Sequence, residues 1–138
     1  LPISIIIGDI NGLKEINDRY GHLTGDLIIK RTANILKNNF ASSKGDFVAR
    51  FGGDEFLVVC RGIEQEVFQK RMKEVRDLVK KEHMRSQETG EPVSMGISAG
   101  CVSLYEFPNA DANDLIKIAD ERLYQAKHLG RNQVVFKS

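Results

Sequence analysis

Tryptophan is absent from this chain of 138 residues, and proline and cysteine are rare, with three and two residues. The two cysteines, Cys60 and Cys101, lack the close spacing of metal ligands, which argues against a zinc site and favours buried thiols over a disulfide. No apolar run approaches the roughly 20 residues of a membrane-spanning helix, and the apolar N-terminal run has no basic leader or cleavage site. We therefore expect a domain that resides in the cytoplasm.

A charge excess of either sign is also missing. The chain has 20 basic and 19 acidic residues, and its net charge of +1 provides no long-range field for nucleic acid or an acidic membrane surface. Any phosphate binding must be local, and we expect no nucleic acid partner. With 41% hydrophobic and 28% charged residues, and no repeat or linker, the chain has the composition of one globular domain.

The most informative segment is RFGGDEFLVVC, at residues 50–60. Gly52 and Gly53 suit a two-residue turn that requires positive φ, and strand-forming side chains flank them. Asp54 and Glu55 are then held at the tip of a hairpin. Adjacent acids repel each other unless a cation or a proton lies between them. A surface hairpin with solvated charges is the simpler alternative.

A second acid follows the apolar run LPISIIIG, which is typical of a strand buried on both faces. Asp9 would stand at the carboxyl end of that strand, where open α/β sheets bind ligands. If the hairpin pairs beside this strand, Asp9, Asp54 and Glu55 converge on one or two divalent cations. Oxygen ligands of this kind suit magnesium or manganese.

Hydrophobic periodicity predicts alternating strands and helices. We expect a strand over 3–9, a polar segment, a helix over about 22–40, the hairpin over about 46–60, a helix near 63–84, a connecting loop over 86–92, a strand over about 95–104, a helix over about 111–128 capped by Asp111 and ended by Gly130, and a strand over 132–136. The predicted inner residues of the first helix are Leu23, Leu27, Ile29, Ala33, Leu36 and Phe40, and those of the second are Phe68, Met72, Val75 and Val79. This order predicts an α/β (α+β) fold with a central mixed five-stranded sheet flanked by helices.

Six ordered blocks resemble the signature of GGDEF domains, the catalytic domains of diguanylate cyclases. They are RFGGDEF at 50–56, DINGLK at 9–14, ND at 17–18, GH at 21–22 with GD at 25–26, GISAG at 96–100 and AKHLGRN at 126–132. The resemblance implies a palm-like, ferredoxin-related nucleotidyl cyclase fold. Relatives usually carry a further segment before the first strand, with an Asp-x-Leu-Thr turn and an Asn-Arg pair. We therefore expect residues 1–138 to form a GGDEF domain that lacks its N-terminal segment and an upstream sensory or dimerisation module.

The chemistry that the resemblance implies is the condensation of two GTP molecules into cyclic di-GMP, with release of two pyrophosphates. Phosphoryl transfer of this kind needs metal ions that neutralise phosphate charge and activate the attacking 3′-hydroxyl. The family pattern assigns metal binding to Asp9, the backbone carbonyl of Ile10 and Asp54, with two Mg²⁺ or Mn²⁺ ions per half-site. Glu55 joins this cluster as a ligand or as an aid to deprotonation, and Asp54 is the candidate proton acceptor.

The resemblance assigns the phosphates to Lys14, Lys127 and Arg131. Lys127 and Arg131 are four residues apart near a helix end and can point the same way. Without the resemblance, solvated charges at a helix C-terminus are the simpler explanation, and with it we expect phosphate contact. Gly52 and Gly53, which lack Cβ atoms, let a nucleotide lie against the backbone.

Base recognition falls to Asn17 and Asp26 in the family pattern. Guanine presents N1–H and N2–H₂ donors that a carboxylate accepts, whereas adenine has no such pair. Helix capping is the structural alternative for Asp26. His22 stands where the family places a histidine near the nucleotide, and packing or capping is an equal alternative for it.

Two further expectations concern regulation and assembly. Relatives inhibited by their product carry Arg-x-x-Asp five residues before the signature, whereas this chain has SKGD at 43–46, so we expect that feedback site to be absent. One domain holds one GTP, and catalysis therefore requires a homodimer. The alternatives are a catalytically silent module that senses GTP or cyclic di-GMP, and a pure interaction domain. Anchoring of the parent protein at the inner membrane, through parts outside this sequence, stays open.

Overall fold

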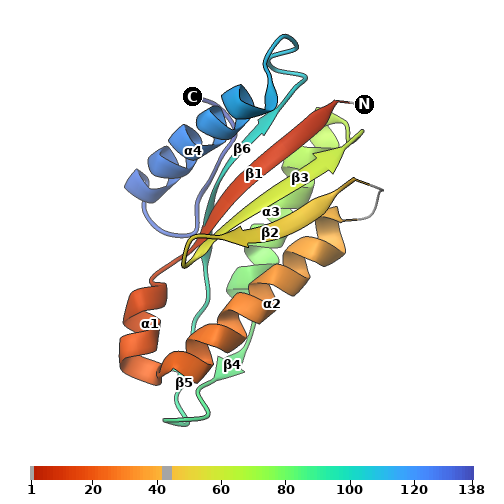
Figure 1. Ribbon diagram of the computed structural model, residues 1–138. Coiled ribbons are helices and arrows are strands. Elements are labelled where there is room, and N and C mark those ends of the chain that lie inside the picture. The colour runs from red at the N-terminus through yellow and green to blue at the C-terminus, as the bar shows by residue number, and fades with distance from the viewer. Residues whose placement is uncertain (1, 42–44) are drawn as a thin grey trace.

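A five-stranded sheet forms the centre of the computed structural model, which describes residues 2–41 and 45–138 (Figure 1). The strand order is β2-β3-β1-β6-β7. The central strand β1 (Ile3–Ile10) runs antiparallel to both β3 (Glu55–Arg61) and β6 (Ile97–Ser103). The edges are β2 (Phe47–Phe51), antiparallel to β3, and the short β7 (Val134–Val135), parallel to β6. The predicted mixed five-stranded sheet is confirmed.

The sheet has a hydrophobic cluster on each face because successive side chains of β1 point to opposite sides. Ile6 and Ile10 pack with residues of α2 (His22–Phe40) and α3 (Gln65–Lys81). Ile5 and Ile7 pack on the other face against α4 (Ala112–His128). A strand buried on both faces explains the nearly unbroken apolar run at the N-terminus.

The helices follow the predicted periodicity with one correction. Phe68, Met72, Val75 and Val79 are all buried on α3, as expected. On α2, the predicted inner residue Leu23 is instead 64% exposed, and Ile28 and Thr32 lie inside together with Leu36 and Phe40. The predicted inner residues Leu27, Ile29 and Ala33 are partly buried and pack against the same core, so Leu23 is the one predicted inner residue of α2 that lies outside.

That preceding helix is α1 (Leu13–Tyr20), which the sequence pattern had assigned to a polar segment. Only Leu13 and Ile16 are buried among its eight residues, so it has too little apolar surface to give a clear periodic signal. The expected connection over 86–92 is the turn of a small hairpin, because β4 (Met84–Arg85) pairs with β5 (Pro92–Val93). The helix expected near 63–84 accordingly ends at Lys81.

Both ends of α4 match their sequence signals. The Asp111 carboxylate accepts the Asp114 N–H at 2.8 Å, and the Asp114 carboxylate accepts the Asp111 N–H at 3.1 Å, which completes a capping box. The helix ends at His128, and Gly130 follows with a φ of 113°. No described helix is long and apolar enough to span a membrane.

Contact between β6 and α4 depends on Gly100, which generates a stability prediction. A Cβ atom at Gly100 would lie 2.0 Å from the Ala119 carbonyl oxygen and 2.3 Å from the Leu123 nitrogen. Because both neighbours are backbone atoms, α4 must shift away from the sheet in a Gly100→Ala variant. We expect a loss of about 1 to 3 kcal/mol in the free energy of unfolding, measured by urea denaturation. Gly53→Ala, where nothing lies within 4 Å of the new Cβ, is the control; equal stability of the two variants would contradict the close packing.

Candidate functional site

The three predicted acids meet where β1 ends beside the β2–β3 turn. Asp9 lies directly opposite Glu55 in the β1–β3 register. One residue further on, the Ile10 N–H donates to the Asp54 carbonyl at 3.0 Å. This backbone bond fixes the position of the turn relative to the central strand, and the two segments of sequence form one acidic centre.

The turn itself differs from the predicted two-residue type. Phe51 pairs with Glu55, so three residues, Gly52 to Asp54, form the loop. Of the two glycines in this loop, only Gly52 has a positive φ, at 73°. The Arg50 guanidinium closes the turn by donating to the Gly53 carbonyl at 2.7 and 3.1 Å. Hydrogen bonds from Arg50 therefore stabilise the turn that carries Asp54. The sequence pattern gave Arg50 no role, although this residue begins the RFGGDEF block.

Asp9 carries the most perturbed carboxyl group of this centre. Asp9 is 7% exposed, and burial raises the pKa of its carboxyl group to about 6. The neighbouring Asp54 carboxyl raises this pKa further. An ion pair between Asp9 Oδ2 and Lys127 Nζ lowers the pKa of Asp9 and raises that of Lys127. Burial also raises the pKa of Glu55. The centre thus contains three acidic side chains, and the single positive charge of Lys127 is too small to neutralise all of them.

The acidic centre fits a divalent cation. Asp9 Oδ1 is buried and has no hydrogen-bond partner, and the Asp54 carboxyl lies close enough to bond with Asp9. Among the described residues, no three His, Cys, Asp or Glu side chains form a group that could hold a metal ion. Two carboxylates with room for further oxygen ligands suit magnesium, which usually completes its shell with waters and substrate phosphates rather than with a protein cage.

A cavity of about 290 Å³ adjoins this centre, and the three predicted phosphate-binding cations all line it. Asp9, Ile10 and Asp54 form one side, and Lys14, Lys127 and Arg131 contribute the cations. Although Arg131 lies beyond the end of α4, it faces the same cavity as Lys127. Its guanidinium also lies against Gly12, where a Cβ would approach within 2.7 Å.

The predicted base-recognition residues line a second cavity of about 390 Å³. Asn17, His22 and Asp26 lie along it, from α1 and the N-terminal part of α2. Gly53 and Arg50 close it from the hairpin. Lys14 and Asp54 line both cavities, so the two are neighbours. Gly52 and Glu55 line neither cavity.

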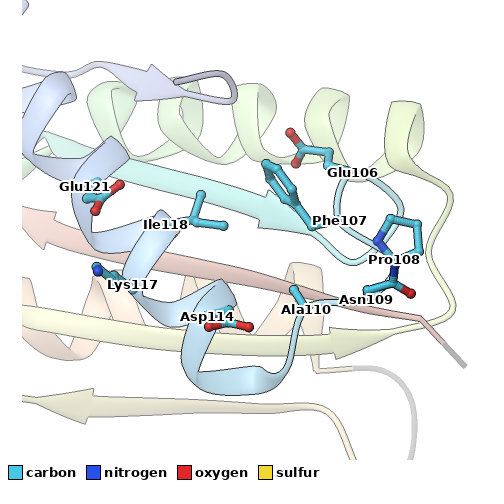
Figure 2. Close-up of a pocket in the computed structure, with 9 residues that line it drawn as sticks. All are labelled: Glu106, Phe107, Pro108, Asn109, Ala110, Asp114, Lys117, Ile118 and Glu121. Atoms are coloured by element: carbon cyan, nitrogen blue, oxygen red, sulfur yellow. The ribbon is translucent and has the colours of Figure 1, made fainter.

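A larger cavity, of about 620 Å³, lies elsewhere, between α4 and the loop that follows β6 (Figure 2). Two of its three acids have partners: Glu106 pairs with the buried Arg122 at 3.1 Å, and Asp114 belongs to the capping box of α4, whereas Glu121 is the third acid. Phe107, Pro108, Ala110 and Ile118 make much of its wall apolar. Size alone therefore does not select a candidate site, and the unpartnered Asp9 oxygen and the three cations favour the cavity beside the acidic centre.

The chain is an α+β domain with a basic cavity beside an acidic centre, and sequence comparison identifies its family. The chain belongs to the GGDEF domain family: residues 1–133 match the family described as "Diguanylate cyclase, GGDEF domain". It is 38% identical over 133 residues to diguanylate cyclase DosC of Escherichia coli, a match that covers 96% of this chain and 28% of DosC. The chain therefore spans less than a third of that relative.

Solved structures agree with the family. The GGDEF domain of DgcB from Caulobacter crescentus, in complex with c-di-GMP, matches with a TM-score of 0.87 and 28% identity over 98% of this chain and 77% of that chain. The active GGEEF domain of a diguanylate cyclase from Vibrio cholerae matches with a TM-score of 0.86 and 28% identity over 99% of this chain and 83% of that chain. The predicted fold class and family are confirmed.

Burial of Asp9 generates a prediction about stability and pH. Folding raises its pKa from 3.8 to about 6, so the fold favours the protonated acid. Its contribution to stability is present in full below pH 3.8 and is lost as the pH rises through about 6. We compare the free energy of unfolding of Asp9→Asn with that of the unsubstituted protein, in metal-free buffer with a chelator. The difference should shift in favour of Asp9→Asn by about 2 to 3 kcal/mol as the pH rises from 4 to 8.

Urea denaturation across this pH range measures the difference between the two proteins. Glu66→Gln, at an exposed position on α3, is the control, and its difference from the unsubstituted protein should stay flat with pH. A flat difference for Asp9→Asn as well would show that burial does not disfavour the Asp9 carboxylate.

Proposed function

We propose that this domain condenses two GTP molecules into cyclic di-GMP and releases two pyrophosphates. The main support is that Lys14 and Asp54 line both the cavity beside the acidic centre and the cavity that carries Asn17, His22 and Asp26. One nucleotide can therefore reach the base-recognition residues and the acidic centre together. Membership of the GGDEF family supports the same reaction.

In this proposal, Asp9, Asp54 and the backbone carbonyl of Ile10 hold divalent metal, Mg²⁺ or Mn²⁺, with two ions in each half-site. Bound metal would neutralise phosphate charge and lower the pKa of the attacking 3′-hydroxyl. The unpartnered Asp9 Oδ1 and the nearby Asp54 carboxyl support this assignment. Glu55, whose pKa burial raises, stands opposite Asp9 and assists as a ligand or in deprotonation.

The protein's side chains then bind the nucleotide and accept the proton. Lys14, Lys127 and Arg131 hold the triphosphate by charge-assisted hydrogen bonds. Asp54 takes the proton of the 3′-hydroxyl as the oxygen attacks the α-phosphate of the other nucleotide. Because Lys127 already neutralises Asp9, it also limits repulsion between the carboxylates and an incoming phosphate.

Base selection follows from the second cavity. The Asp26 carboxylate accepts the N1–H and N2–H₂ edge of guanine, and Asn17 adds an amide contact. His22 lies beside the nucleotide on the same wall. The exposed turn at Gly52 and Gly53 leaves room for the nucleotide to approach the backbone.

The reaction requires two copies of the domain, since each supplies one GTP and the attack is reciprocal. We propose a homodimer in which two half-sites face each other. A sensory or dimerising module upstream in the parent chain would control this encounter, and any membrane anchor would lie in that part.

Product feedback is weak in this proposal, because Ser43 occupies the place of the family arginine. Ser43 and Lys44 lie outside the described residues, and the Asp46 carboxylate accepts the Arg61 N–H at 2.9 Å.

Product analysis tests the proposed reaction. Concentrated protein incubated with GTP and Mg²⁺ should form cyclic di-GMP and pyrophosphate, identified by mass spectrometry. Asp54→Ala should lower the rate at least about 100-fold, because it removes both a metal ligand and the proton acceptor. Glu66→Gln should keep the full rate.

Binding without turnover, even in a dimeric form, would favour a sensor of GTP or cyclic di-GMP, and absence of GTP binding would favour an interaction domain. Cyclic di-GMP added to the same assay at low micromolar concentration should leave the initial rate unchanged. Tight inhibition that Asp46→Ala abolishes would show that a feedback site exists.

The dimer requirement predicts that the rate per domain depends on concentration. Because two half-sites must meet, the specific activity should rise as protein concentration rises over a hundredfold range below the dimer dissociation constant. Fusion to a parallel dimeric coiled coil should raise the activity at low concentration and flatten this dependence. A flat rate per domain in the unfused protein, with sedimentation velocity showing monomer throughout, would exclude reciprocal catalysis.

A further inference from the structure

The β4–β5 hairpin contacts the junction of α1 and α2, which carries the residues that line the base cavity (Figure 1). In the hairpin turn, Ser86 is 2% exposed, and its hydroxyl donates to the Tyr20 carbonyl at 2.9 Å. The Thr24 hydroxyl lies 3.1 Å from both Ser86 Oγ and the Tyr20 carbonyl oxygen. Ser86 thus joins the last residue of α1 to the first turn of α2.

Glu88, from the same turn, caps α2. The N-cap residue of α2, Gly21, has no side chain to accept an N–H, and the first turn of this helix contains no acid. Glu88 Oε1 instead accepts the Leu23 N–H at 3.2 Å. A Cβ at Gly21 would lie 1.9 Å from the Glu88 carboxylate, so only glycine permits this approach. A residue distant in sequence therefore supplies both the acceptor and the negative charge that a helix N-terminus favours.

These contacts control the geometry of the base cavity. Asp26 follows the capped Leu23 by three residues, and His22 precedes it by one. Asn17 packs from α1 against Gly25, where a Cβ would lie 1.7 Å from Asn17 Oδ1. The hairpin residues Arg85 and Gln87 also line one small cavity of about 190 Å³ together with Asp26. Any displacement of the hairpin turn would move the junction that holds these three side chains.

We infer that Ser86 and Glu88 are positioning residues for guanine recognition, an inference that rests on the proposed function. They contact no nucleotide. They hold the α1–α2 junction so that Asp26 and Asn17 meet the base edge, and they thereby determine the preference for guanine. The proposed phosphate-binding residues lie away from this junction. Lys14 is at the opposite end of α1, Lys127 is on α4, and Arg131 follows α4.

The test compares two non-hydrolysable triphosphates that carry a methylene between the α- and β-phosphates, one with guanine and one with hypoxanthine, which lacks the 2-amino group. Isothermal titration with Mg²⁺ gives the ratio of their dissociation constants. Glu88→Ala should lower the preference for guanine roughly fivefold, because guanine loses alignment of both N1–H and N2–H₂ with Asp26. Hypoxanthine, which keeps only the N1–H, should lose less affinity. Glu88→Gln keeps the Oε1 acceptor and should restore most of the preference. Ser86→Ala is the second variant, and Glu66→Gln is the matched exposed control.

A double-mutant cycle assigns the effect to Asp26. In an Asp26→Ala background, Glu88→Ala should cause no further loss of preference, because the group that it positions is already gone. Melting temperatures of the variants exclude global unfolding. Equal weakening of both triphosphates would indicate general loosening and would overturn the inference, as would an unchanged preference in both Glu88→Ala and Ser86→Ala.

The inference and the proposed function fail in different ways. Cyclic di-GMP formation with an unchanged guanine preference in the hairpin variants would overturn the inference and leave the cyclase standing. Absence of guanine binding in the unsubstituted protein would overturn both.

Discussion

The whole site depends on the register between β1 and β3. Because Asp9 faces Glu55 and the Ile10 N–H bonds to the Asp54 carbonyl, the turn cannot slide along the central strand without breaking the antiparallel ladder. A shift of one residue would also move every apolar side chain of β3 to the wrong face. Burial of both sheet faces therefore secures the position of the carboxylates, and the stability of the core and the geometry of the acidic centre have one cause.

This centre is costly to the fold. A buried carboxylate with an unpartnered oxygen, beside two further acids, is the kind of group that a protein built for stability alone would avoid. Lys127 reduces the repulsion without removing it, because one ammonium faces several acids. The remaining negative charge favours the divalent cation that the proposed function requires, and perturbed pKa values of this kind cluster at functional sites.

The recognition half of the site is built differently, from short segments with little apolar surface. The helix α1 buries only Leu13 and Ile16, and the first turn of α2 carries a glycine N-cap and no acid. Hydrogen bonds from the β4–β5 hairpin supply what these segments lack. In the proposed function, the site combines an acidic centre on the central sheet with a base cavity beside a distant turn, so that different parts of the chain hold its two halves.

The sequence by itself determined the alternation of strands and helices in a mixed five-stranded sheet, the buried faces of β1 and α3 and the cap of α4, because hydrophobic periodicity is a local pattern. The family signature nominated Asp9, Asp54, Lys14, Lys127, Arg131, Asn17 and Asp26, whose roles stay predictions. The sequence pattern missed α1, misplaced Leu23, assigned two residues to a three-residue turn and gave Arg50 no role. Only the tertiary structure decided that Ser86 and Glu88 touch the α1–α2 junction and that Gly100 must lack a side chain. Such contacts join residues far apart in sequence, and their energies depend on packing distances that no local pattern records.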